Sequence, residues 1–142
     1  MSTNFRTIWT TPERDIEVID QRQLPHEFVV VKLKTYKDAD LAIRSMTVRG
    51  APLIGATAAY GIFLAVRELI DKGLDGSFLD EAFTVLRASR PTAVNLFWAL
   101  DRMQKTLDEA DDFLEAAWNE ANLIVEQDIE TCRLIGVHGL PL

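Results

Sequence analysis

The sequence predicts an α+β fold in which a small N-terminal antiparallel sheet is followed by a helical bundle. Residues 1–37 are rich in β-branched and aromatic side chains with strand period, whereas apolar residues from 38 to 142 recur at helical spacing. With 142 residues, 48% hydrophobic and 26% charged, the chain has the size and composition of one globular domain. Because no repeat or low-complexity linker interrupts it, we expect residues 1–142 to form a single sheet-plus-helix domain.

Three segments are candidate strands. Ile16–Ile19 and Phe28–Tyr36 are β-rich, and the second alternates in strand period. The segment Gln23–His26 between them contains proline and is predicted to turn. Phe5–Trp9 can supply a third strand, so the sheet should precede all helices.

The first helices follow this sheet directly. Asp38 is predicted to cap a short helix that ends near Val48, because Arg49–Pro52 is typical of a turn. A second helix is predicted from about Pro52 to Leu69 and is apolar on nearly every side. Such a helix belongs in the centre of the domain.

Three further helices complete the predicted bundle. Ser77 and Asp80 have the spacing of a capping box, and the helix that they begin should stop before Pro91. The next helix is predicted to start at Thr92 or Ala93, and the last near Asp111. The last helix should end at Gly136 or Gly139, and its expected buried stripe consists of Leu114, Ala117, Ala121, Ile124, Ile129 and Cys132.

Charge and composition exclude several classes of function. The net charge is −7 and its acidity is C-terminal, which disfavours nucleic acid and anionic lipid, so we expect neither nucleic acid nor membrane as partner. The uncharged stretch Gly50–Val66 is too short to span a bilayer. A single cysteine and no visible secretory signal indicate a cytoplasmic protein. His26 and His138 lie far apart without a nearby carboxylate pattern, so we expect no metal and no cofactor.

The segment Val48–Gly55 is a candidate anion site. It combines a turn, an arginine (Arg49), a glycine (Gly50) and the start of an apolar helix. Unpaired backbone N–H groups at a helix start, the positive end of the helix dipole and a guanidinium group together suit a phosphate. The alternative is an ordinary helix start with a solvated arginine. The spacing of these residues, taken alone, favours this alternative.

The segment Ser89–Leu96 repeats this arrangement. Arg90 stands just before a predicted helix start, and Thr92 or Asn95 can supply hydroxyl contacts. Two such helix starts can converge on one phosphate and one sugar. The alternative, favoured if the segment is taken alone, is that Thr92 caps the helix and Arg90 is solvated.

Taken together, these segments resemble the methylthioribose-1-phosphate isomerase family. That family shares a superfamily with ribose-1,5-bisphosphate isomerases and with regulatory subunits of a translation-initiation guanine-nucleotide exchange factor. The resemblance extends over essentially the whole chain, and four segments carry it in order: Ile19–Pro25, Ala42–Pro52, Ala58–Gly61 and Ser89–Leu96.

The resemblance implies an aldose–ketose isomerase that converts 5-methylthioribose 1-phosphate to 5-methylthioribulose 1-phosphate in methionine salvage. It implies that Arg49, Gly50 and Ala51 bind the substrate's phosphate or sugar and that Arg90 adds a second contact. It places the catalytic cysteine and aspartate in a Rossmann-like domain beyond Leu142, so no catalytic residue is expected in this chain. A homodimer is implied for the full-length protein.

Three alternatives to this function remain open. A ribose-1,5-bisphosphate isomerase would need further cationic groups for its second phosphate. A non-catalytic regulatory subunit would leave the arginine pair exposed with no shared anion. A complete helical binding protein is the third.

Other chemically capable side chains are interpreted as structural. Cys132 falls on the expected buried stripe of the last helix, away from both arginine segments, and is predicted to be a core residue. The ten carboxylates between Asp101 and Glu130 scatter over two amphipathic helices and fit a solvated face. Trp9, Trp98 and Trp118 are predicted to be packing residues.

Overall fold

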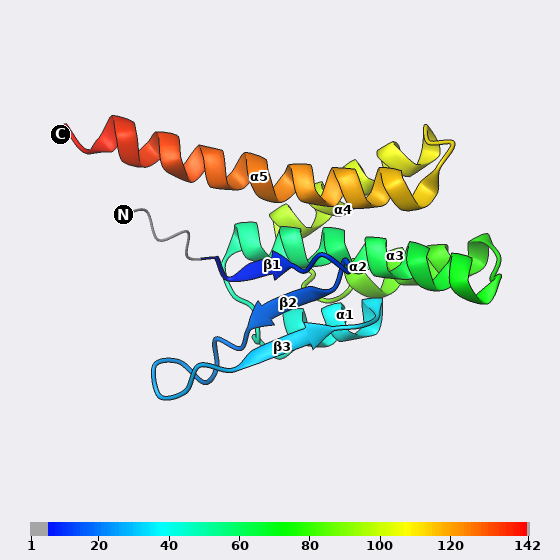
Figure 1. Ribbon diagram of the computed structural model, residues 1–142, viewed down its shortest axis with the longest axis horizontal. Helices are drawn as coiled ribbons and strands as arrows, with labels where there is room; N and C mark the ends of the chain where they lie inside the picture. Colours follow the sequence, from blue (N-terminus) through cyan, green and yellow to red (C-terminus); the bar gives the residue numbers. More distant parts are fainter. Residues whose placement is uncertain (1–5, 142) are drawn as a thin grey trace.

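Three strands and five helices follow one another in the computed structural model, which describes residues 6–141 (Figure 1). The strands are β1 (Ile8–Thr10), β2 (Ile16–Ile19) and β3 (Val30–Leu33), paired antiparallel in the order β1-β2-β3. The α+β class and the position of the sheet before the helices are therefore confirmed. Part of the predicted first strand, including Phe5, lies outside the described residues.

The helices are α1 (Tyr36–Arg44), α2 (Ala51–Lys72), α3 (Gly76–Arg87), α4 (Val94–Asp108) and α5 (Phe113–Gly139). The predicted strand Phe28–Tyr36 was too long, because β3 spans only Val30–Leu33 and Tyr36 already begins α1, with its ring buried in the core. Every helix lies close to where the sequence predicts it. Two cap assignments were wrong for local reasons. Thr35, not Asp38, caps α1, while the Asp38 carboxylate accepts from the Thr35 N–H as the other half of the capping box.

The second corrected cap is that of α3. Asp75 caps this helix by accepting from the Ser77 N–H at 3.0 Å, so the predicted capping box of Ser77 and Asp80 does not form. Both errors have one origin: each segment offers two competent caps within a few residues, and the backbone path of the preceding loop selects between them.

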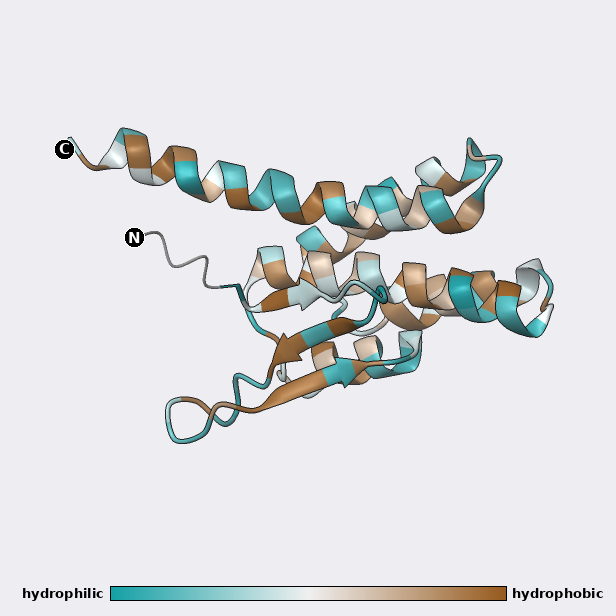
Figure 2. Cartoon of the chain, in the orientation of Figure 1, coloured by the Kyte–Doolittle hydropathy of each residue, from teal (hydrophilic) through white to brown (hydrophobic). Residues whose placement is uncertain are grey.

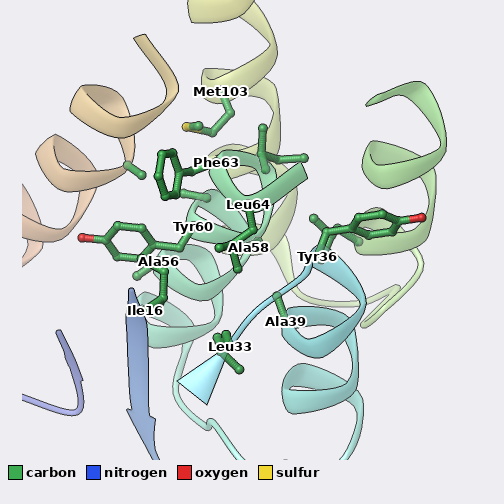
Figure 3. Packing of buried hydrophobic residues seen from close by; sticks show 14 of the residues in the cluster. Ile16, Leu33, Tyr36, Ala39, Ala56, Ala58, Tyr60, Phe63, Leu64 and Met103 are labelled. Carbon is green, nitrogen blue, oxygen red and sulfur yellow. The ribbon is translucent and has the colours of Figure 1, made fainter. Parts of the chain in front are cut away.

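The core is built around α2. All residues of this helix from Leu53 to Val66 are buried, and it contacts each of the other four helices. Figure 3 shows side chains from β2, β3 and the neighbouring helices around it, among them Ile16, Leu33 and Met103. By length and composition α2 would also suffice to cross a membrane, but 72% of its most apolar stretch is buried inside the molecule, as in the core helix of a globular domain.

The end of α5 differs from the rest of the bundle. Its first half buries Ala117, Ala121, Ile124 and Val125, whereas every described residue from Glu126 onward is exposed except Asp128, which is partly buried. The last turns extend past the other helices and strands (Figure 1). Apolar residues still recur there, as Figure 2 shows, and Ile135 is 66% exposed.

Candidate functional site

The start of α2 presents free backbone donors. Gly50 stands before the helix with φ 95, a left-handed value that glycine adopts without strain. No side chain caps the helix, and within residues 6–141 the N–H groups of Ala51 and Leu53 have no acceptor. Pro52 between them has no N–H to satisfy. The positive end of the α2 dipole therefore faces outward with unused donors, which is an arrangement suited to an anion.

The start of α4 has the same character. Its cap position is Ala93, and no side chain supplies a capping hydrogen bond. The alternative in which Thr92 caps this helix is therefore wrong. The turn before α4 is held to α1, because the hydroxyl group of Ser89 donates to the carboxylate of Asp40. Arg90 follows this anchored residue and is partly exposed.

The two helix starts are joined directly. The side-chain amide of Asn95 donates to the Ala51 carbonyl at 2.8 Å. Gly55, one turn further along α2, lies so close to α4 that a Cβ atom there would stand 2.7 Å from Asn95 Nδ2. The absence of a side chain at Gly55 thus permits the close approach of these helices. The two arginine segments, 44 residues apart at this hydrogen bond, are neighbours in space.

The two arginines carry uncompensated charge. Among residues 6–141, seven arginines form ion pairs with carboxylates, and Arg49, Arg67 and Arg90 do not. Arg67 is engaged otherwise, because it donates to the Arg14 carbonyl at 2.9 Å. Arg49 makes only a long contact of 3.4 Å to the Gln21 carbonyl. Arg49 and Arg90 are thus positioned beside helix starts with their charge available for an anion.

Two cavities meet at Gly50. We call the first the Arg49 cavity; it measures about 430 Å³ and lies between β1, the start of α2 and the exposed half of α5. The second, the Arg90 cavity, measures about 520 Å³ and lies between the starts of α2 and α4. The Arg49 cavity is lined by Arg6, Thr7, Ile8, Gln21, Arg49, Gly50, Pro52, Leu53, Ala56, Val125, Asp128, Ile129 and Cys132. The Arg90 cavity is lined by Gly50, Ala51, Ile54, Arg90, Thr92, Ala93, Val94 and Asn95.

The four residues predicted from the sequence are therefore brought together around these helix starts. Gly50 belongs to both cavities, Arg49 to one, and Ala51 and Arg90 to the other. Arg49 and Arg90 line two adjacent cavities that share Gly50, rather than one cavity. Their joint contact with a single ligand stays a prediction.

The prediction for Cys132 was wrong. Its side chain is exposed and lines the Arg49 cavity together with Arg49 and Gly50, instead of packing in the core away from the arginine segments. Ile129, assigned to the same stripe, is 36% exposed. The apolar residues of α5 recur at the predicted helical period, but the helix continues beyond the other helices and strands against which its first half packs.

Asp128 is a site residue that the sequence did not single out. It lies one helical turn before Cys132 on the same face of α5, is partly buried and lines the Arg49 cavity. Burial raises the pKa of its carboxyl group. In the sequence it was one of ten scattered carboxylates, and only its position on α5 relative to α2 distinguishes it.

Comparison with known proteins gives the same fold and a family. Residues 47–142 match the model of the initiation factor 2 subunit family. Over 144 residues the chain is 46% identical to methylthioribose-1-phosphate isomerase of Desulfatibacillum aliphaticivorans, covering 97% of this chain and 39% of that protein. Over 140 residues it is 49% identical to the Methylorubrum populi protein of the same name, covering 95% and 37%.

Two solved structures share the architecture. One is 5-methylthioribose 1-phosphate isomerase from Pyrococcus horikoshii OT3, with a TM-score of 0.76 and 36% identity over 90% of this chain and 38% of that chain. The other is the translation initiation factor eIF-2B, subunit delta, from A. fulgidus, with a TM-score of 0.79 and 33% identity over 89% and 38%. The chain thus spans 37% to 39% of the length of the relatives described here.

Proposed function

Since the chain belongs to the initiation factor 2 subunit family, we propose that it is the substrate-phosphate-binding N-terminal part of a methylthioribose-1-phosphate isomerase. The observation that carries this proposal is the junction of two uncapped helix starts at Gly50, each beside an arginine without a carboxylate partner among the described residues. The higher identity to the isomerases than to the delta subunit supports an enzyme over a regulatory subunit.

In this proposal the chain binds and orients the substrate. The N–H groups of Ala51 and Leu53 donate to phosphate oxygens, Gly50 permits their close approach, and Arg49 neutralises the charge. Arg90 reaches the same ligand from the adjacent cavity. The cysteine and aspartate that the resemblance implies for catalysis are expected in a further domain that this chain does not span. The chain alone should bind without turnover.

The remaining parts of the proposal concern the whole protein. We infer a cytoplasmic homodimer that uses a phosphorylated sugar as substrate, with no nucleic acid, membrane, metal or organic cofactor. The C-terminal acidity disfavours polyanionic partners, and this supports the inference for nucleic acid and anionic lipid.

A titration tests the binding function. Nuclear magnetic resonance follows the chain as methylthioribose 1-phosphate is added, because this method registers even weak binding. Arg49→Ala should weaken binding by about tenfold or more, since a charge-assisted hydrogen bond contributes about 1.5–3 kcal/mol. The control is Arg87→Ala, which removes an equal charge from an arginine already paired with Asp101 at 2.7 Å. Equal affinity of wild type and Arg49→Ala contradicts the proposal.

A further inference from the structure

The charges around the Arg49 cavity are arranged unevenly. At the Gly50 end, Arg49 has no carboxylate partner among the described residues. Arg6 also lines the cavity, but its guanidinium group is paired with Glu126 at 3.0 Å, so this second cation is already compensated. Arg49 is therefore the one cation of the cavity lining that has no carboxylate partner among the described residues.

The opposite wall, which α5 supplies, is acidic and apolar. Asp128 is partly buried there, and within residues 6–141 its carboxylate forms no hydrogen bond or ion pair; burial raises its pKa. Its neighbours on this wall include Val125 and Ile129. A partly desolvated carboxylate without partners is unfavourable until a donor reaches it.

A sugar monophosphate fits this polarity. If its phosphate binds at Arg49 and the α2 start, hydroxyl groups that reach the α5 wall can satisfy the carboxylate there as neutral donors, without adding charge. A second phosphate at the far end of the sugar meets the opposite situation. If the sugar extends to the α5 wall, that phosphate would meet the carboxylate of Asp128, and Arg6, the other cation of the lining, is held by Glu126.

We propose that Asp128 is a specificity-determining residue, whose carboxylate accepts hydrogen bonds from the hydroxyl groups of a sugar monophosphate and repels the second phosphate of a bisphosphate. This inference rests on the proposed phosphate site at Arg49 and Gly50. It distinguishes between the two enzyme functions that the sequence left open, and it favours the monophosphate. Specificity here comes from a repulsive element as much as from an attractive one.

The test compares two ligands that differ by one phosphate group, ribose 1-phosphate and ribose 1,5-bisphosphate. Dissociation constants are measured at fixed ionic strength for the wild type, Asp128→Asn and Glu130→Gln, with circular dichroism as a check of folding. The substitution Asp128→Asn keeps the size of the side chain and removes its charge. Glu130 is a matched control, because it lies on the same helix, is exposed, and is paired with Arg133 at 2.8 Å outside the cavity.

We expect the wild type to prefer the monophosphate. Asp128→Asn should raise the affinity for the bisphosphate relative to the monophosphate on the order of tenfold, since juxtaposed like charges are strongly unfavourable in a partly desolvated site. Glu130→Gln should leave this ratio unchanged. A wild type that prefers the bisphosphate, or a ratio that Asp128→Asn does not alter, overturns the inference.

Arg49→Ala, measured with the same two ligands, separates this inference from the function on which it rests. If Arg49→Ala weakens both ligands while Asp128→Asn leaves their ratio intact, the phosphate site stands and the role of Asp128 is refuted. If neither ligand binds the wild type, the proposed function fails and the role of Asp128 fails with it.

Discussion

The side-chain amide of Asn95 donates to the backbone carbonyl of Ala51, and this hydrogen bond of 2.8 Å ties the first turn of α4 to the first turn of α2. The contact requires the two helices to approach closely, and Gly55 provides the room. Two segments that each contain an arginine before the helix start are thereby held at a fixed distance. The geometry of the candidate site depends on this junction more than on any feature of either segment alone.

Gly55→Ala should disturb the junction. Its new Cβ atom would stand 2.7 Å from Asn95 Nδ2 and 3.2 Å from the Asn95 carbonyl oxygen, so backbone as well as side chain must shift. The free energy of unfolding should fall by about 1–3 kcal/mol, as for other overpacked core positions. Urea denaturation measures this change.

The control for that prediction is Gly136→Ala on the exposed end of α5, where a Cβ atom meets nothing within 4 Å. This substitution should stabilise the helix by about 0.5–1 kcal/mol, because alanine loses less backbone entropy than glycine. Equal stabilisation by the two alanines would show that α2 and α4 are not closely packed at Gly55.

Arg90→Ala should weaken sugar phosphate binding, and its effect should depend on Arg49. If both guanidinium groups contact one ligand, the double variant will deviate from additivity by about 0.5–3 kcal/mol in binding free energy. The measurement is a double-mutant cycle with methylthioribose 1-phosphate. Strict additivity would mean that the adjacent cavities act independently.

Cys132 should react with N-ethylmaleimide in the folded protein. It is exposed and is the single cysteine of the chain, so the labelled fraction reports on one position. Bound sugar phosphate should slow the labelling, because the thiol lines the Arg49 cavity. Mass spectrometry follows the reaction with time.

Arg49→Ala supplies the control for this protection experiment. In that variant the thiol should remain as reactive as in the wild type, while the ligand should no longer protect it. Protection that persists in Arg49→Ala would place the ligand elsewhere on the molecule.

Asp20 should make stability fall on acidification. Its carboxylate accepts from the Arg22 side chain at 2.8 and 2.9 Å and from the Arg22 N–H, and these hydrogen bonds hold the pKa of Asp20 below its ordinary value. A pKa that is lower in the folded state contributes stability above the unfolded value of about 4, and this contribution is lost as the pH falls below it. Asp20→Asn should therefore lower stability at pH 7 and flatten its decline in acid. Urea denaturation from neutral pH down into this acid range measures both effects, and an unchanged slope in the variant would contradict the assignment.

Much of the fold could be predicted from the sequence, because its apolar residues recur with the periods of strands and helices. The segment Leu53–Val66 is apolar on all sides, and only a central helix buries such a surface. The caps at Thr35 and Asp75 could not be predicted as securely, since they depend on the path of the loop before each helix. Cys132 was misplaced because period reveals which face of a helix is apolar, but not how far the packing partner extends.

The candidate site was predictable only in parts. Arg49 and Arg90 each precede a helix start, and this local relation is visible in the sequence. Their placement around Gly50 follows from the contact of Asn95 with Ala51, which joins residues distant in the chain. Asp128 was invisible for the same reason, because its role depends on the register of α5 against α2.

The projecting end of α5 affects the affinity of the Arg49 cavity for a ligand. One wall of the Arg49 cavity, with Asp128 and Cys132, belongs to turns of α5 that pack little against the rest of the molecule. The amide hydrogens of these turns should exchange with solvent sooner than those of α2. A sugar phosphate that reaches from Gly50 to this wall must steady the projecting turns as it docks. Any contact that already orders these turns before binding should increase the affinity without touching the ligand.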